Sequence, residues 1–212
     1  MEAYDYAALW RHLKGMRPWQ IIALGASCAE KVTPIVHYLA LPDTWDLARR
    51  ITEFSWSTLA EEAPDVEEAS RLQRALESMP EWQIDYPDSL PFVVTQALDL
   101  FQFALATVTA PSIAEKADHV GFSSMLERAE LFDLAIEQHP ELTSPGRGLR
   151  SIEEASQRRL VAILDREERP SERVIHELRR EAKTISDLFE GAMPVYCFHI
   201  AWALIRTANR RG

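Results

Sequence analysis

The chain has 212 residues, of which 47% are apolar and 26% charged, and its formal net charge is -10. This composition is that of a folded globular domain and excludes a disordered chain. The net acidity opposes binding to nucleic acid, which requires a basic face, and is compatible with a basic protein partner or simply with solubility.

Secretion and membrane insertion are not expected. The first stretch, MEAYDYAALWRHLKG, begins with acidic residues and lacks the continuous apolar region of a signal peptide. The longest apolar tract near the end, Val195–Ile205, is shorter than the roughly 20 residues that span a bilayer. Cys28 and Cys197 lie far apart in apolar runs, which predicts two reduced thiols. We therefore expect a cytoplasmic protein.

Helix signals follow one another along the chain. Only 7 glycines occur, and because turns between strands favour glycine, their scarcity favours helices. Asp43, Asp65, Ser112 and Ser151 are each followed three positions later by a carboxylate, the pattern of a helix cap. Together with the spacing of apolar residues, these signals predict helices over 4–15, 19–39, 44–60, 66–78, 91–109, 113–138, 152–168, 171–189 and 195–209.

Two of these helices, Trp19–Tyr38 and Pro91–Val108, are apolar on nearly every face. Such helices must be covered all round. We therefore predict an all-α, single-domain bundle of eight or nine helices over residues 1–212, with two central apolar helices wrapped by amphipathic ones. Pro34 is expected to bend or end the first central helix. The SPGRG loop at 144–148 marks a candidate subdivision.

The first central segment, WQIIALGASCAEKVTPIVHY, carries Cys28, Glu30, Lys31 and His37. These residues suggest a thiol nucleophile with a base, or a metal cluster. On a helix, however, Glu30 and His37 lie two turns apart, about 10 Å along the axis, which is too far for one metal ion without ligands from other helices. Cys28 lies on a different face from both. We therefore predict a buried structural thiol and neither a metal site nor a catalytic cysteine.

Glu30 and Lys31 need an explanation, because an unpaired charge in a central helix is costly. A structural explanation pairs Glu30 with an arginine of a neighbouring helix, such as Arg49 or Arg50. A functional one places Glu30, Lys31 and His37 at the edge of a pocket between the two central helices. Both explanations stay open at the level of the sequence.

The stretch from Glu61 to Pro91 is strongly acidic, with nine acidic residues and two arginines. Its last part, MPEWQIDYPDSLP, alternates apolar or aromatic with acidic side chains. Exposed aromatics ringed by carboxylates are typical of a protein-binding surface. In the alternative, this loop caps the core with its aromatics turned inward. The candidate partner-binding residues are Glu67, Glu68, Glu81, Trp82, Asp85, Tyr86 and Asp88.

The segment RPWQIIALGASCAEKVTPIVHY, followed by ARRITEFSWSTL, resembles the start of the YjaG-like bacterial family of unknown function. The likeness continues in YPDSLPFVVTQALDLFQFAL and SIAEKADHVGFSSM and covers about residues 8–140. Three positions depart from the family pattern: Ala29 separates Cys28 from Glu30, Lys31 stands in place of arginine, and Val94 in place of an acidic residue. The resemblance implies an all-helical fold and brings no activity. Its matching residues are Trp19, Gln20, Cys28, Glu30, Pro34, Tyr38 and Trp56.

Two functions of different classes stay open. The first is a non-enzymatic, acidic protein-binding module, such as a bacterial immunity protein that neutralises a toxin, docking through the stretch from Glu61 to Asp88. The second is a helical ligand-binding protein or enzyme with a pocket near the 19–39 helix. No phosphate-binding loop, nucleophile elbow, HExxH or paired CxxC motif occurs, so no cofactor is predicted. The apolar C-terminal helix is compatible with a homodimer.

Overall fold

The computed structural model describes residues 15–61, 63–83, 90–142 and 148–211. Within these ranges all regular structure is helical, which confirms the predicted all-α fold. The expected helix over 4–15 lies outside the described residues. The elements are α2 (Pro18–Leu39), α3 (Pro42–Ser57), the 3-10 helix η1 (Thr58–Ala60), α4 (Val66–Glu77), the 3-10 helix η2 (Pro80–Gln83), α5 (Leu90–Thr109), α6 (Pro111–Gln138), α7 (Leu149–Asp165) and α8 (Glu172–Arg211).

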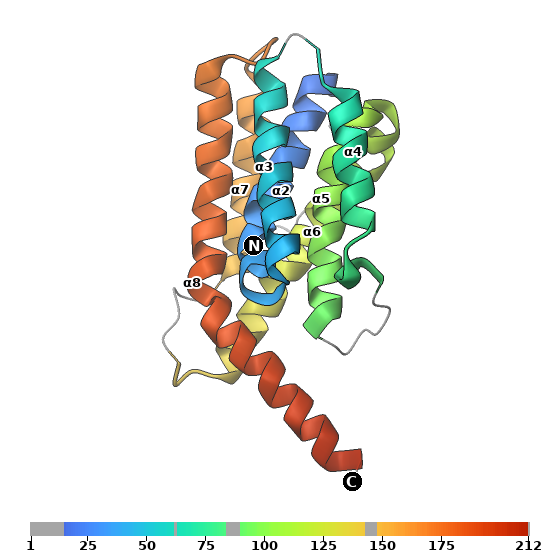
Figure 1. Cartoon of the computed structure of the whole chain (residues 1–212). Helices are drawn as coiled ribbons and strands as arrows, with labels where there is room; N and C mark the ends of the chain where they lie inside the picture. Colours follow the sequence, from blue (N-terminus) through green and yellow to red (C-terminus); the bar gives the residue numbers. More distant parts are fainter. Residues whose placement is uncertain (1–14, 62, 84–89, 143–147, 212) are drawn as a thin grey trace.

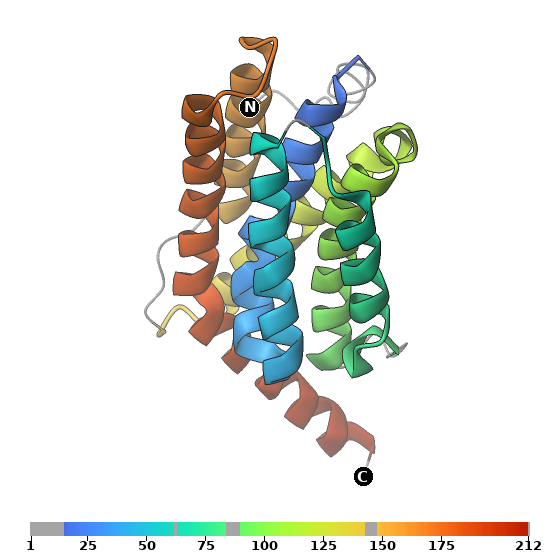
Figure 2. The same cartoon turned by 45° about the horizontal axis from the view of Figure 1, so that its top comes forward.

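Helix α2 is central, as its apolar sequence predicts. It contacts α3, α5, α6 and α8, and every residue from Gln20 to Val32 is buried. Helices α7 and α8 lie on one side of it, while α4 and α5 lie on the other (Figures 1 and 2). Helix α5, the second predicted central helix, packs along α2 but exposes Asp99. Only one helix is therefore covered all round within the described residues.

Helices α2 and α5 approach closely where α2 carries a glycine. A Cβ atom on Gly25 would lie 2.7 Å from the Thr107 hydroxyl oxygen and 3.0 Å from the Ala104 Cα. Both distances are tighter than ordinary contact, and the second involves backbone, which cannot move aside cheaply. Gly25 thus permits a spacing that any larger residue would widen.

Three of the four predicted caps, Asp43, Ser112 and Ser151, lie inside their helices, because α3, α6 and α7 start at Pro42, Pro111 and Leu149. Asp65 does cap α4, because its carboxylate accepts the Glu68 N–H at 2.9 Å. Helix α7, however, starts at Leu149 and not beyond Ser151, so Ser151 is not its cap. The cap comes from Asp133 of α6, whose carboxylate accepts three consecutive backbone N–H groups at 2.8–3.0 Å. These belong to Gly148, Leu149 and Arg150; Gly148 has a φ of 84°, a backbone region that favours glycine.

The two helices predicted at 171–189 and 195–209 form one continuous helix, α8, with Pro194 inside it. The prediction of a break is wrong: the helix tolerates the loss of one hydrogen bond, to the carbonyl of Glu190, and both Glu190 and Pro194 are exposed to solvent. The last part of α8 turns away from the bundle and projects beyond it (Figure 1). Helix α2 likewise continues across Pro34.

Candidate functional site

Lys31 is buried inside the bundle, where it forms an ion pair that joins α2 to α7. Its ammonium group, 1% exposed, donates to both carboxylate oxygens of Glu153, which is 0% exposed, at 2.8 and 2.9 Å. The Gln157 side-chain amide donates to the same carboxylate at 2.9 Å. Buried charges are tolerated when they are paired and their remaining hydrogen-bonding capacity is used. Lys31 is therefore a structural residue.

Glu30 is also paired, and the partner differs from the predicted one. Its carboxylate accepts the indole N–H of Trp56 at 2.9 Å and lies 3.4 Å from Nε of Arg179 on α8. The expected partners Arg49 and Arg50 are exposed on α3. The structural explanation thus holds, but with an arginine that lies 149 positions further along the chain, beyond the reach of local pattern.

Arg179 joins Glu30 to the surface. Its guanidinium also bonds to the carboxylate of Glu53 on α3, and this hydrogen bond is the main cause that raises the pKa of Arg179. The guanidinium carbon lies 6.0 Å from the centroid of the Trp56 ring, within cation–π range. This cluster joins α2, α3 and α8 at the edge of the bundle.

His37 lies apart from Glu30 and Lys31. It is exposed near the end of α2, and its ring lies 4.6 Å from that of Trp45. Cys28 is buried, as predicted. The predicted pocket at Glu30, Lys31 and His37 is therefore not formed, and among the described residues no group of three or more His, Cys, Asp or Glu residues could hold a metal ion.

The predicted docking surface is only partly present. Glu67 is exposed, whereas Glu68 makes a two-point hydrogen bond to Arg71 at 2.6 and 2.7 Å, which lowers the pKa of Glu68. Trp82 is half-buried and packs against the core, as in the inward-facing alternative. The remaining predicted residues Asp85, Tyr86 and Asp88 lie outside the described residues.

Glu81 is a correction to that prediction. It is 5% exposed, and its two carboxylate oxygens accept the Leu41 backbone N–H and the Thr44 hydroxyl, both at 2.8 Å. These groups belong to the start of α3, so Glu81 serves as the cap of that helix in place of Asp43. Because the Glu81 carboxylate already accepts these two hydrogen bonds within the protein, it is not available to a partner. No local sequence signal identifies it, because Glu81 and α3 meet only in the folded chain.

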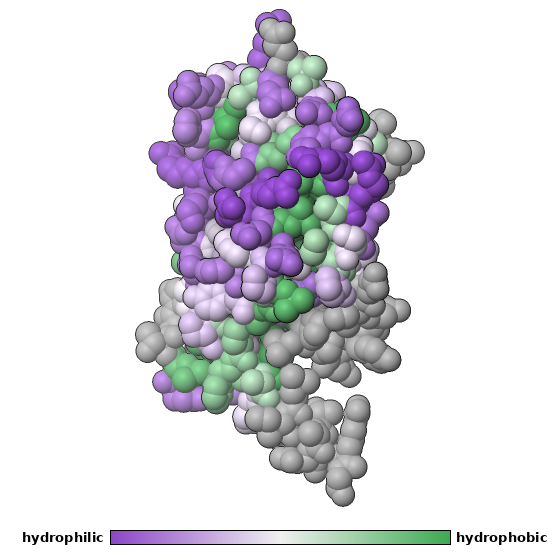
Figure 3. Space-filling view, in the orientation of Figure 1, coloured by the Kyte–Doolittle hydropathy of each residue, from purple (hydrophilic) through white to green (hydrophobic). Residues whose placement is uncertain are grey.

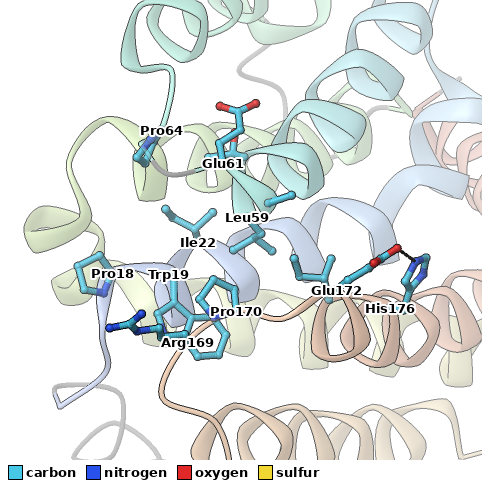
Figure 4. Close-up of a pocket in the computed structure, with 13 residues that line it drawn as sticks. Pro18, Trp19, Ile22, Leu59, Glu61, Pro64, Arg169, Pro170, Glu172 and His176 are labelled. Carbon is cyan, nitrogen blue, oxygen red and sulfur yellow. Dashed lines mark ion pairs between the residues drawn. The ribbon is translucent and has the colours of Figure 1, made fainter.

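A cleft of about 890 Å³ lies at the end of the bundle where α2 and α8 begin and α3 ends (Figure 4). Three segments of the chain meet there, and each contributes a proline: Pro18, Pro64 and Pro170. The indole N–H of Trp19 is buried and has no hydrogen-bond partner among the described residues. The main apolar lining comes from Pro18, Trp19, Ile22, Leu59, Pro170 and Ile175.

Charged residues border this cleft. Glu61 follows η1, and its carboxylate points away from the apolar lining (Figure 4). Glu172 and His176 lie 3.9 Å apart in the first turns of α8 and are largely exposed, and Arg169 precedes them. The acidic start of α4 adjoins the cleft through Pro64. The cleft joins residues from three separate segments, 18–22, 58–64 and 169–176, which is why local patterns in the sequence do not identify it.

Comparison with protein-family models, with curated proteins and with solved structures yields no match. The resemblance to the YjaG-like family therefore stays a prediction. Within the described residues, no helix combines the length and apolar character needed to cross a membrane.

Proposed function

We propose that this chain is a non-enzymatic protein-binding module, of the kind represented by a bacterial immunity protein that neutralises a toxin. The observation that carries the proposal is the cleft of about 890 Å³ with an apolar lining, bordered by Glu61, Glu172, Arg169 and His176 and adjoined by the acidic start of α4. The partner would present an apolar side chain or short segment to the cleft, with basic residues beside it.

The construction of the cleft suits an anchor residue from another protein. Interface energy concentrates where an apolar or aromatic side chain fills a pocket surrounded by a polar rim. Pro18, Pro64 and Pro170 restrict the backbone at three sides of this cleft, which reduces the ordering that binding would require. A rigid apolar lining therefore supports binding of a preformed partner surface.

Although Arg169 also borders the cleft, the acidic start of α4 beside it and the net charge of the chain favour a basic partner. Glu61 and Glu172 border it, and Asp65 and Glu67 follow on the start of α4. The chain carries a net charge of -10, which speeds encounter with a positively charged protein. This border replaces the predicted docking surface, from which Glu81 is removed because it is buried.

The alternative, a ligand-binding protein or enzyme using Glu30, Lys31 and His37, has less geometric support. Two of these residues are engaged in ion pairs inside the bundle, and the third lies exposed beside Trp45. Among the described residues, Lys31 is enclosed with Glu153 while His37 lies at the exposed end of α2, so a substrate could not contact the three together.

The proposal is tested by affinity capture from the native cell with tagged wild-type protein and with the double variant Glu61→Lys, Glu172→Lys. We expect the wild type to retain a stoichiometric protein partner that the variant loses, with association slowed at least tenfold for the purified pair. The control is Glu77→Lys together with Asp46→Lys, the same charge change at exposed positions that do not line the cleft. Equal capture by the cleft variant and the control would contradict the proposal.

A further inference from the structure

The last part of α8, residues 198–211, forms an arm that projects beyond the bundle (Figures 1 and 2). The helix just before it belongs to the core, because Val195 and Tyr196 are 1% and 4% exposed. Figure 3 shows hydrophobic residues gathered at the lower end of the bundle, where the arm leaves it. The first turn of the arm therefore meets the bundle in a mainly apolar surrounding.

Two histidines hold the root of the arm, residues 198–202, on the bundle. Nδ1 of His199, on the arm, lies 3.3 Å from Nε2 of His139, which closes α6. His139 is 5% exposed, and the rings of Phe198 and Trp202 meet its ring edge-on, with centroids 4.9 and 5.5 Å away. His139 is thus the side chain on which the first turn of the arm packs.

The contact between the two rings depends on the number of protons that they carry. A hydrogen bond between two imidazoles needs one nitrogen that donates and one that accepts. With both rings neutral, one of the two facing nitrogens carries a proton and the other accepts it. One further proton, taken up on a nitrogen that faces away, leaves this arrangement intact. A second further proton puts N–H groups on both facing nitrogens and a positive charge on both rings, so that no acceptor remains.

Glu141 determines which ring accepts. Its carboxylate lies 3.5 Å from Nδ1 of His139, the ring nitrogen that does not face His199. A carboxylate beside one ring nitrogen favours the tautomer that carries the proton there. We therefore assign Nδ1 of His139 as protonated, Nε2 of His139 as the acceptor and Nδ1 of His199 as the donor. In this assignment the first further proton is taken up on Nε2 of His199.

The neighbouring helices supply no other counter-charge to the pair. Among the described residues, Glu141 is the only carboxylate in contact with either ring. On α8, burial raises the pKa of Tyr196 and of Cys197, so both stay neutral in acid. Burial, and next the nearby His139, lower the pKa of His199. Two charged rings at this contact are therefore opposed by burial and by each other.

The charged groups of the other elements that pack on α6 and α8 are engaged elsewhere. On α2, His37 contacts Tyr38 and Trp45. On α7, Arg150 pairs with Glu130 of α6. Arg128 lies three turns before His139 on α6 and donates to Gln96 of α5. The protonation of the pair is thus governed by the two rings, Glu141 and burial.

We propose that His139 and His199 form a proton-operated latch, which holds the root of the arm on α6 until both rings are charged. Release separates the two rings and uncovers the faces of Phe198 and Trp202 that pack on His139. The core part of α8 stays in place, because Val195 and Tyr196 precede the latch. Release needs a pH well below the ordinary histidine pKa of about 6.5, at roughly pH 5. The latch is separate from the cleft and does not depend on the proposed function.

The test is backbone amide hydrogen exchange of the full chain at pH 7.5 and pH 4.5, expressed as protection factors so that the intrinsic effect of pH is removed. We expect protection of residues 198–202 to fall at least tenfold in acid, while residues 21–32 of α2 change less than twofold. Protection of the root that is equal at both pH values would overturn the proposal. So would a fall of the same size in α2, because it would show that the whole bundle opens.

Variants separate the latch from other effects of acid. His199→Gln keeps a side-chain donor toward His139 but cannot take up a proton, so its root should keep its protection within about twofold. The matched control is His176→Gln, at an exposed histidine near the start of α8, and it should follow the wild type. Loss of protection in His199→Gln as large as in the wild type would contradict the latch.

The wild type alone provides a second measurement, which does not require any variant to fold. Nitrogen-15 NMR of the histidine rings follows the two protons separately. We expect His139 and His199 to titrate in two distinct steps, with the second step coinciding with the loss of protection at the root. Two rings that titrate independently, with no change in the amides of residues 198–202, would overturn the proposal.

Discussion

Charged groups are buried and paired in the interior of the bundle, whereas those at the cleft at its end are exposed to solvent. Inside, Lys31 and Glu153 are 1% and 0% exposed and satisfy each other. At the cleft, Glu172 and His176 are largely exposed and only 3.9 Å apart. The interior charges hold helices together, whereas the charges at the cleft remain accessible to another molecule. Chemically suggestive residues in a central helix are therefore not by themselves a site.

The largest expected effect comes from breaking the interior pair. Lys31→Met leaves the Glu153 carboxylate buried without its counter-ion, and we expect a loss of about 3–5 kcal/mol in the free energy of unfolding. The double variant Lys31→Met, Glu153→Met removes both charges and should recover most of that loss. Urea unfolding at neutral pH measures both proteins. A single variant as stable as the wild type would contradict the structural role of Lys31.

A smaller effect separates two glutamates that the sequence groups together. Glu81→Ala leaves the Leu41 N–H and the Thr44 hydroxyl without their acceptor in a buried place, and we expect a loss of about 1–3 kcal/mol. Glu67→Ala, at an exposed position of α4, should change stability by less than about 0.5 kcal/mol. Thermal or urea unfolding of the two variants gives the comparison, and equal effects would show that Glu81 is not a cap.

The smallest effect concerns the histidine pair at the root of the arm. Burial, and next the nearby His139, lower the pKa of His199 below its ordinary value of 6.5. The unfolded chain therefore takes up a proton first as the pH falls, so stability present above pH 6.5 is lost below it. The other ring nitrogen of His139, Nδ1, lies 3.5 Å from a carboxylate oxygen of Glu141.

We expect the Tm of the wild type to fall between pH 7 and pH 5 by about 1–2 °C more than that of His199→Gln, which keeps a polar group but cannot titrate. Calorimetry at the two pH values measures the difference. Identical shifts in both proteins would show that His199 does not contribute to the pH dependence.

Local sequence patterns predict more of the fold than of the candidate site. The all-α class, the buried path of α2 and the cap at Asp65 follow from periodicity and short-range signals. The partners of Lys31 and Glu30 and the residue that caps α7 do not follow from such signals, because these contacts join residues far apart in the sequence. Local patterns do not predict the cleft for the same reason, since three separate segments of the chain contribute to it.

Pro194 and Trp82 show a different limit. A proline removes one N–H donor from a helix but does not by itself end it, since α8 continues across exposed Pro194 and α2 across buried Pro34. Trp82 follows Glu81 and precedes Asp85 in sequence, yet it packs against the core. For Trp82 the deciding quantity is solvent exposure, which alternation along the chain does not determine.

The distinction between interior and cleft is tested most directly by measuring partner affinity for two variants side by side. The partner is the protein captured with the wild type. The interior variant carries both Lys31→Met and Glu153→Met, and the cleft variant carries both Glu61→Lys and Glu172→Lys. We expect the dissociation constant for the partner to stay within about twofold of the wild-type value in the interior variant and to be at least tenfold higher in the cleft variant. An interior variant that folds but no longer binds, with a cleft variant that binds normally, would contradict the distinction.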